Sequence, residues 1–476
     1  MRRLKRNKCN LSESPASSIS FRLIRPHRFS RNSVVCLYKS SHSAVFRRSG
    51  IVYQVHQPGL GEFCILPAKA CILAHPVGCF LPETTLHVTY LAHDLDDPAI
   101  WRRVEMLRRG GADVRVAGFR RGQGPLPEPA TVLGRTANGR MVQRVRAIGA
   151  AWPGIARAVP PQDGPEVVLA RNLEMLALGA RLVRARKGRA RLVYELLDIH
   201  GMMLGQGAVA RTLRRVEAAL MRRAELVVLS SPAFAARYLG PHGQPGVSAL
   251  LVENKPFARP QAARPDAPAP GGLEQGGPLV IGWFGMLRCR WSLAVLDQLT
   301  RATPGRFRVV LRGRPALDVM EDFHAVIDAN PDLSFLGPYA WPGDLPDIYG
   351  GVDVAWLIDR YQAGQNSDWL LPNRLYEGCL NGAVPVVLDG TEVARRTAAW
   401  GCGVTVAAPD PEAVAAALSA LDPAGLARRR AAVSAIPRAA LEMDDAECRR
   451  LTAAICGTGA VPLAEAASPA IPALAR

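Results

Sequence analysis

The sequence predicts an α/β protein with two domains, each built around a parallel β-sheet. Short apolar segments that are typical of buried strands alternate with amphipathic helical segments in both halves of the chain. Residues 257–278, between the halves, are rich in Pro and Gly and show no apolar periodicity, which indicates a linker. A chain of 476 residues can form two domains of ordinary size. We therefore expect domains over residues 86–256 and 279–456.

Residues 1–85 differ from the rest of the chain in composition. They are rich in Ser and Arg, hold 13 Lys and Arg against three acidic residues, and show no sustained helix or strand period. They contribute more than half of the formal net charge of +18. We predict a disordered or over-extended N-terminal segment here, and a disordered tail over residues 457–476. The remaining chain is only mildly basic and has no aromatic-interleaved basic motif, so we expect no nucleic-acid partner.

Cysteine spacing and hydropathy argue against a metal site and a membrane span. The five cysteines outside the N-terminal segment lack the spacing of metal ligands, so we expect a reduced protein with no metal and no disulfide framework. The most apolar stretch, residues 63–81, is interrupted by Lys69, His75 and two prolines. We therefore predict a cytoplasmic protein. Its mildly basic body suits peripheral contact with the inner membrane surface.

The first domain begins with a strand–helix–strand unit. Residues 86–94 fit a buried strand, residues 98–109 fit a helix that two glycines end, and residues 113–119 alternate as a second strand. This order favours a parallel sheet. No G-x-G-x-x-G motif follows the first strand, so we expect no dinucleotide cofactor.

Polar residues follow two later strands of this domain. Arg171 follows a strand over residues 166–170, and Asp198 and His200 follow a strand over residues 191–196. Open α/β sheets bind ligands beyond the carboxyl ends of their strands, so these three residues are candidates for a site. A histidine after a strand is also commonly structural, and its position alone leaves both interpretations open.

The second domain begins with a strand over residues 279–284 that runs into Gly285. A glycine at this point permits close approach of the backbone to a ligand. Arg288 and Arg290 follow in the same loop, where guanidinium groups could meet phosphate. The loop is therefore a candidate anion site.

Residues 366–388 combine the clearest local signals of the chain. Pro372 suits the first turn of a helix that runs to about residue 380, and Gly382 then permits a left-handed stop. Asn373, Arg374 and Glu377 share one face of this helix. The helix N-terminus with Arg374 beside it is an anion site, and Glu377 could accept hydrogen bonds from neighbouring hydroxyls. A phosphate next to hydroxyls describes a nucleotide, although such helices with a solvated Arg–Glu pair are also common.

The motif in this stretch resembles the nucleotide-sugar motif of retaining group 1 (family 4) glycosyltransferases, which have the GT-B fold of two Rossmann-like domains facing a cleft. The matching pattern, over residues 372–387, is P-x-[RK]-L-Y-E-x-x-x-x-G-x-x-P-V-V. The resemblance implies that Glu377 binds the nucleotide ribose and that Asn373 and Arg374 approach the donor sugar and diphosphate. Many members carry a further Glu eight residues before this one, where the present chain has Trp369.

The resemblance extends more weakly to two other segments. It implies that Gly285, Arg288 and Arg290 grip the donor diphosphate. The phrase YELLDIHG is similar to a family segment whose Asp and His face the transferred sugar, which implies catalytic roles for Asp198 and His200. Because these cations could stabilise the leaving diphosphate and the sequence shows no D-x-D pattern of the metal-dependent kind, no metal or other cofactor is expected.

The function implied by the resemblance is transfer of a sugar, by a hexosyltransferase type of enzyme. The donor would be a nucleotide-sugar and the acceptor a hydroxyl of a glycan or lipid-linked molecule, with retention at the sugar carbon. The likeness is nearest to enzymes of bacterial exopolysaccharide assembly, including the succinoglycan type. A nucleotide-sugar epimerase of GT-B shape and a catalytically inactive nucleotide-sugar-binding protein, the latter suggested by Trp369, remain as alternatives.

Deletion of the chain to about Pro82 should leave folding and nucleotide-sugar turnover intact, because residues 1–85 lack the patterning of a folded domain. Soluble yield, thermal unfolding and turnover of the truncated and full chains would be compared. Loss of soluble protein on truncation would contradict this expectation.

Overall fold

The computed structural model describes residues 85–136, 141–242, 248–258 and 272–459, together with the backbone of four N-terminal strands. The chain divides into two compact units, Met1–Thr84 and Thr85–Arg476. In the first unit the strands pair antiparallel in the order β1-β2-β3-β4. The other residues of this unit, most of the predicted linker and the tail after residue 459 lie outside the described residues, as does the prediction of disorder for them. The four strands are β1 (Leu37–Ser40), β2 (Ser43–Arg48), β3 (Ile51–His56) and β4 (Phe63–Pro67).

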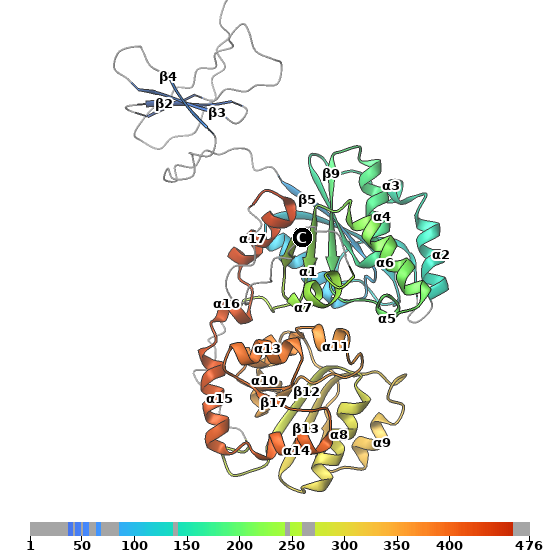
Figure 1. Ribbon diagram of the computed structural model, residues 1–476, viewed down its shortest axis with the longest axis vertical. Helices are drawn as coiled ribbons and strands as arrows, with labels where there is room; N and C mark the ends of the chain where they lie inside the picture. Colours follow the sequence, from blue (N-terminus) through green and yellow to red (C-terminus); the bar gives the residue numbers. More distant parts are fainter. Residues whose placement is uncertain are drawn as a thin grey trace, which may run out of the picture. The chain divides into compact units, whose positions relative to one another are not determined.

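The second unit begins with a seven-stranded parallel sheet in the order β11-β10-β9-β8-β5-β6-β7 (Figure 1). The first strand in the chain order of this sheet, β5, pairs in parallel with β6 on one side and β8 on the other. Parallel pairing needs a crossover after each strand. Helices supply it at every step except from β6 to β7, which residues 121–130 connect without a helix. The strands are β5 (Leu86–Ala92), β6 (Ala112–Arg120), β7 (Thr131–Arg135), β8 (Glu166–Arg171), β9 (Ala190–Leu196), β10 (Leu226–Leu229) and β11 (Ala249–Leu251).

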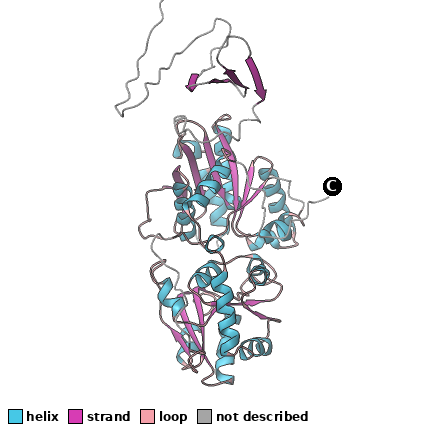
Figure 2. Cartoon of the chain, turned by 90° about the vertical axis from the view of Figure 1, so that its left-hand side faces the viewer, coloured by secondary structure: helices cyan, strands magenta, loops and turns pink. Residues whose placement is uncertain are grey.

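Helices cover both faces of this sheet, so its central strands are buried on both sides (Figure 2). The first helix starts where the sequence predicts, because the Asp97 carboxylate accepts a hydrogen bond from the Ala99 N–H at 2.9 Å and Pro98 follows the cap. We call this sheet and its helices the first lobe. The helices are α1 (Pro98–Arg109), α2 (Met141–Ala151), α3 (Ile155–Ala158), α4 (Asn172–Ala185), α5 (Gly201–Leu204), α6 (Ala208–Met221), α7 (Pro232–Phe234) and the π-helix η2 (Ala235–Leu239).

A second parallel sheet, of six strands, has the order β14-β13-β12-β15-β16-β17. Its central strands are apolar along their whole length, as expected for a sheet covered on both faces. We call this sheet and helices α8–α16 the second lobe. The strands are β12 (Leu279–Leu287), β13 (Phe307–Pro315), β14 (Leu333–Phe335), β15 (Val354–Trp356), β16 (Val384–Leu388) and β17 (Val404–Val406).

The helices of the second lobe alternate with its strands up to β17 and then follow one another. They are α8 (Arg290–Ala302), α9 (Phe323–Asp328), α10 (Leu345–Gly350), α11 (Asn366–Trp369), α12 (Asn373–Leu380), α13 (Glu392–Ala399), α14 (Pro411–Ser419), α15 (Pro423–Ala435) and α16 (Arg438–Leu441). Two parallel sheets with alternating helices confirm the predicted fold class.

The last helix, α17 (Asp445–Cys456), does not belong to the second lobe, which corrects the predicted domain boundary at residue 456. Its Cys448, Leu451 and Ile455 lie in the same buried cluster as Val104 and Leu107 of α1. Helical periodicity shows that a helix has an apolar face, but it does not show which of two sheets buries that face. The chain therefore returns to the first lobe at its end.

Gly110 at the end of α1 permits this contact. A Cβ atom on Gly110 would lie 2.4 Å from the Thr452 Cβ and 2.6 Å from the Cys448 carbonyl oxygen, both in α17. The neighbouring Gly111 has a φ of +88° and ends α1, as predicted. Gly110 is thus required by close helix–helix approach and Gly111 by the backbone turn.

Gly110→Ala should lower the free energy of unfolding by about 1–3 kcal/mol, because the added methyl group must displace α17. Gly154→Ala is the matched control, since a Cβ atom there would meet nothing within 4 Å and the residue has a φ of −94°. Urea unfolding of both variants would test this. Equal stability of the two variants would show that α17 does not depend on close contact at Gly110.

Candidate functional site

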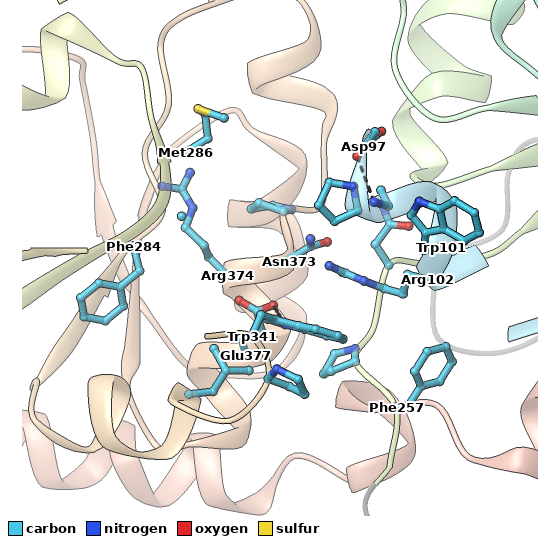
Figure 3. Close-up of a pocket in the computed structure, with 18 of the residues that line it drawn as sticks. Asp97, Trp101, Arg102, Phe257, Phe284, Met286, Trp341, Asn373, Arg374 and Glu377 are labelled. Carbon is cyan, nitrogen blue, oxygen red and sulfur yellow. Dashed lines mark hydrogen bonds between the residues drawn. The ribbon is translucent and has the colours of Figure 1, made fainter. Parts of the chain in front are cut away.

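A cleft with a volume of about 1660 Å³ lies where the carboxyl ends of both sheets face each other. Its wall on the first lobe is formed by the loops after β5, β8 and β9 and by one face of α1. Its wall on the second lobe is formed by the carboxyl ends of β12 and β13, the loops after β12, β14 and β15, and the first turns of α12. Figure 3 shows side chains from both lobes pointing into this space.

Helix α12 presents the predicted polar face to the cleft. Pro372 has an extended backbone and caps the helix, which begins at Asn373, one residue later than expected. Leu375 and Cys379 are buried in the core of the second lobe. Glu377 lies on the other face and lines the cleft together with Asn373 and Arg374, the other two residues predicted for it.

Glu377 is almost completely buried, with 3% of its surface exposed. Its Oε1 accepts a hydrogen bond from the indole Nε1 of Trp341 at 2.9 Å. Burial raises the pKa of this carboxyl, and the nearby Arg102 and Arg374 guanidinium groups oppose that rise. Sequence reasoning did not identify Trp341. The signal available was a large aromatic residue in the loop after β14, a strand of the second sheet.

Arg102 reaches into the cleft from the opposite lobe (Figure 3). Its guanidinium carbon lies 4.6 Å from the centre of a Trp341 ring, which is a cation–π distance. In the amide orientation that satisfies its neighbours, the Asn373 oxygen accepts a hydrogen bond from Arg102 Nη1 at 2.8 Å. Burial lowers the pKa of Arg102, whereas the charge of Glu377 raises it. Arg102 was not predicted, because its position on α1 gave no sign that it faces the second lobe.

Two of the predicted cations line the second-lobe wall. Arg374 has a buried Nη1 atom without a hydrogen-bond partner among the described residues. Arg288 lies 3.4 Å from the Asp359 carboxylate, and its guanidinium carbon is 4.9 Å from the centre of the Tyr361 ring. Both side chains are only partly exposed and present positive charge to the cleft.

Gly285 lies at the rim of the second sheet with a φ of +98°. It pairs with Gly313 of β13, where a Cβ atom would lie only 1.9 Å from the Gly285 carbonyl oxygen. The two glycines therefore allow β12 and β13 to continue in close contact to the edge of the cleft. Gly285 lines the cleft, as the sequence predicts.

Arg290 is not brought into this site. It is the first residue of α8, is 55% exposed, and its Nη1 atom pairs with Asp322 at 2.9 Å. It is absent from the lining of the cleft, which contains Arg288. Between these two residues the chain passes from loop to helix, and the helix start directs Arg290 away from the cleft. The expectation that both arginines meet one phosphate group is therefore wrong for this geometry.

Asp198 and His200 also differ in position, because one of them lines the cleft and the other does not. Asp198 lines the cleft, and desolvation by the surrounding protein raises the pKa of its carboxyl group. His200 caps α5, where its Nδ1 accepts a hydrogen bond from the Met202 N–H at 3.3 Å. It lies outside the lining of the cleft, and burial lowers its pKa. The structure therefore supports a position in the site for Asp198 and a helix-capping position for His200.

Arg171, a candidate by position alone, forms part of the first-lobe wall with 2% of its surface exposed. Its Nη1 donates to the Tyr90 hydroxyl at 3.2 Å, and its Nη2 lies 3.6 Å from the Asp97 carboxylate. His93, after β5, and Asn172, after β8, line the cleft beside it and were not predicted. Both residues follow buried strands directly, which is the signal that could have identified them.

Trp369, at the position where many members of the resembled family have Glu, has a structural role in this chain. It is 8% exposed and packs into the hydrophobic cluster of the first lobe, although α11 precedes α12 of the second lobe. Its carbonyl oxygen accepts a hydrogen bond from the Ser231 hydroxyl at 2.5 Å. The amide of Asn366 bonds both the N–H and the carbonyl of Ile199, at 3.0 and 2.6 Å. This short helix therefore joins the two lobes beside the cleft.

The described residues include no group of His, Cys, Asp and Glu side chains that could hold a metal ion. Within the same part of the chain, every helix is too short or too polar to cross a bilayer.

Comparison with solved structures confirms the two-domain α/β fold, which this chain shares with GT-B glycosyltransferases. No family model matches the chain. A structure of Alr3699/HepE from Anabaena in complex with UDP-glucose covers 78% of this chain and 100% of its own, with a TM-score of 0.56 at 16% identity. Sucrose-phosphate synthase from Thermosynechococcus elongatus covers 75% of this chain and 94% of its own, with a TM-score of 0.56 at 15% identity. The glycosyltransferase WaaG gives a TM-score of 0.52 at 14% identity, over 78% of this chain and 100% of its own.

A closer relationship is found at the level of sequence. The succinoglycan biosynthesis protein ExoL of Rhizobium meliloti (strain 1021) is 44% identical to this chain over 349 residues. The match covers 71% of this chain and 85% of that protein. Identity at this level over most of both chains establishes common ancestry and, with the two parallel sheets, a common fold. The chain therefore belongs to the family of the succinoglycan biosynthesis protein ExoL, an exopolysaccharide-biosynthesis family with the fold of GT-B glycosyltransferases.

Proposed function

We propose that the protein is a glycosyltransferase of bacterial exopolysaccharide biosynthesis that uses a nucleotide-sugar donor. The observation that carries this proposal is the arrangement of Arg374 and Glu377 on the cleft face of α12, with Arg288 on the same wall. Two cations and one buried carboxylate fit a ligand that has a diphosphate and neighbouring hydroxyls. The membership in the ExoL family and the UDP-glucose complex of the Anabaena protein support the same conclusion.

The nucleotide would lie against the second lobe. Glu377 uses one oxygen for Trp341, which leaves the other oxygen to accept a ribose hydroxyl. Arg374 has a buried Nη1 atom without a partner among the described residues, and this atom can bind an anion. The Asp359 carboxylate holds the Arg288 guanidinium on one side. As the bond to the sugar breaks, negative charge develops on the diphosphate, and these guanidinium groups would stabilise it without a metal ion or other cofactor.

The acceptor hydroxyl would approach from the first lobe. With the diphosphate held on the second-lobe wall, the acceptor can attack on the face that the leaving group vacates, which gives retention at the sugar carbon. No protein side chain has to act as a nucleophile. Asp198 faces this space from the end of β9, and its raised pKa suits a group that shares a hydrogen bond with a sugar hydroxyl. The acceptor would be a glycan or a lipid-linked saccharide.

Helix α6 suits peripheral contact with an anionic membrane surface from the cytoplasmic side. Its Val209 and Val216 are 59% and 45% exposed, and Arg211 and Arg215 are exposed between them. Glu217, the acidic residue of this helix, is completely buried. A helix with exposed valines and arginines combines apolar insertion with attraction to anionic lipids.

Incubation of the protein with radiolabelled nucleotide-sugars, UDP-glucose among them, tests the proposed activity without knowledge of the acceptor. Slow release of nucleoside diphosphate and free sugar supports transfer, because water then replaces the acceptor. Interconversion of the nucleotide-sugar would indicate an epimerase instead. Binding without turnover, with Trp369 in place of a glutamate, would indicate an inactive binding protein.

Glu377→Gln should weaken nucleotide affinity by roughly 1.5–3 kcal/mol, because a neutral amide replaces the charged acceptor of a ribose hydroxyl. Glu377→Ala should lose more, and both variants should discriminate less between UDP and 2′-deoxy-UDP. Stability should change by about 1 kcal/mol or less in Glu377→Gln, which keeps an acceptor for Trp341. Calorimetric titration would measure the affinities. Intact ribose discrimination in folded variants would make Glu377 a structural residue only.

Arg288→Ala should weaken UDP affinity by roughly 1.5–3 kcal/mol, the magnitude of a hydrogen bond to a charged group. Arg290→Ala is its matched control, since this side chain lies outside the cleft and pairs with Asp322. Its UDP affinity should stay close to that of the wild type. Equal losses in the two variants, measured by the same titration, would mean that the loop rearranges on binding and that the geometry described here is not the ligand-bound one.

A further inference from the structure

Three buried polar atoms on the first-lobe wall have no hydrogen-bond partner among the described residues. They are the Nδ1 atom of His93, the Nε atom of Arg171 and the Oδ1 atom of Asn172. All three residues line the cleft. A buried polar atom without a partner costs about 1–3 kcal/mol, so three of them in one place call for an explanation.

The sheet register brings these residues to one level. Strands β5 and β8 are parallel neighbours, and their last paired residues are Leu91 and Ala170. Arg171 follows that pair by one residue, and His93 and Asn172 follow it by two, on their respective strands. The three side chains therefore come from adjacent strand ends, where open parallel sheets bind ligands.

The backbone at this point is held in an uncommon conformation. Asn172 has a φ of +70°, in the left-handed region that non-glycine residues seldom adopt. It is the first residue of α4, directly after Arg171 at the end of β8. Strain of this kind is concentrated at ligand sites, where it places a side chain that an ordinary helix start would turn elsewhere.

The rest of the wall fixes the chemistry of these atoms. Arg171 is held by Tyr90 and Asp97, so its Nε–H points from a rigid position. Burial, reinforced by the charges of Arg171, Arg121 and Arg144, lowers the pKa of His93 well below its ordinary value. The imidazole is therefore neutral and offers one donor and one acceptor rather than a positive charge. Asn172 Oδ1 offers an acceptor. His93 and Asn172 thus offer neutral donors and acceptors, and Arg171 adds a charged donor. Hydroxyl groups, which both donate and accept, match such a set.

We propose that His93, Arg171 and Asn172 form a subsite for the hydroxyl groups of a pyranose bound on the first-lobe wall of the cleft. When His93 Nδ1 carries the proton, a single hydroxyl can accept from it and donate to Asn172 Oδ1. In the other tautomer, two neighbouring hydroxyls donate to the two acceptors. Arg171 Nε donates to a further sugar oxygen. The inference rests on the proposed function, since the pyranose is either the sugar of the donor or the sugar of the acceptor.

Two variants remove the unpartnered atoms with little change in shape. His93→Phe replaces the imidazole by an apolar ring, and Asn172→Gly suits the left-handed backbone. In the full-length protein each variant should lose about ten-fold in affinity for the sugar probes, as expected for one lost hydrogen bond. The melting temperature should stay equal or rise, because an unsatisfied polar atom is removed. His93→Gln and Asn172→Asp, which retain hydrogen-bonding atoms, should lose less.

The probes are UDP, UDP-glucose and the methyl gluco-, galacto- and mannopyranosides, the last group measured by saturation-transfer NMR on UDP-loaded protein. Weaker binding of the methyl pyranosides with unchanged UDP-glucose affinity assigns the subsite to the acceptor sugar. Weaker UDP-glucose binding with unchanged UDP affinity assigns it to the donor sugar. Either result supports the proposal.

Thr452→Val is the matched control, because its Oγ1 is also buried and unpartnered but lies in α17 outside the cleft. It should leave all sugar affinities unchanged. Unchanged sugar binding in folded His93→Phe and Asn172→Gly would overturn the subsite, as would a large loss of stability without a loss of sugar binding. Absence of UDP binding by the wild type would overturn the proposed nucleotide-sugar function itself, which distinguishes the two failures.

Discussion

The packing of α1 between the first sheet and α17 is the constraint on which the cleft depends. One face of α1 is buried, with Ile100, Val104 and Leu107 in the hydrophobic cluster that α17 completes. The opposite face, which carries Arg102, is thereby turned toward the second lobe. The pair of Lys255 with Glu447, at 2.7 Å, ties the chain leaving the first lobe to the same helix. The position of α1, and with it the first-lobe wall of the cleft, is therefore fixed by contacts on the buried face of this helix.

The two walls of the cleft carry different side chains, and this difference suggests that they bind different parts of the ligand. The second lobe presents Arg288 and Arg374 with fewer facing carboxylates, which suits an anion. The first lobe pairs its buried Arg171 internally with Tyr90 and Asp97 and turns the neutral side chains of His93 and Asn172 toward the cleft. A nucleotide-sugar has the same polarity, with charge on the diphosphate and hydroxyls on the sugar. Two contacts described above cross between the walls. Arg102 stacks on Trp341, and its Nη1 donates a hydrogen bond to the Asn373 oxygen.

Local signals predicted much of this arrangement, and non-local packing decided the rest. The strands, the helix after Pro372 and its polar face follow from periodicity, turn residues and spacing, all of which act within a few residues. The position of Arg290 depended on where α8 begins, and a shift of one or two residues turns a side chain through a large angle. His93 and Asn172 meet only through the pairing of β5 with β8, and Trp341 meets Glu377 only through the tertiary fold. Sequence spacing carries no information about such pairs.

The short helix α11 has a mechanical consequence. Trp369 and Asn366 are bonded to Ser231 and Ile199 of the first lobe, whereas α12 begins a few residues later and is buried in the second. Any rotation that widens the cleft must either break these bonds or be absorbed by the backbone between Trp369 and Asn373. The intervening segment acts as a tether of fixed length, and tension in it would be transmitted directly to the first turn of the helix that carries Arg374 and Glu377.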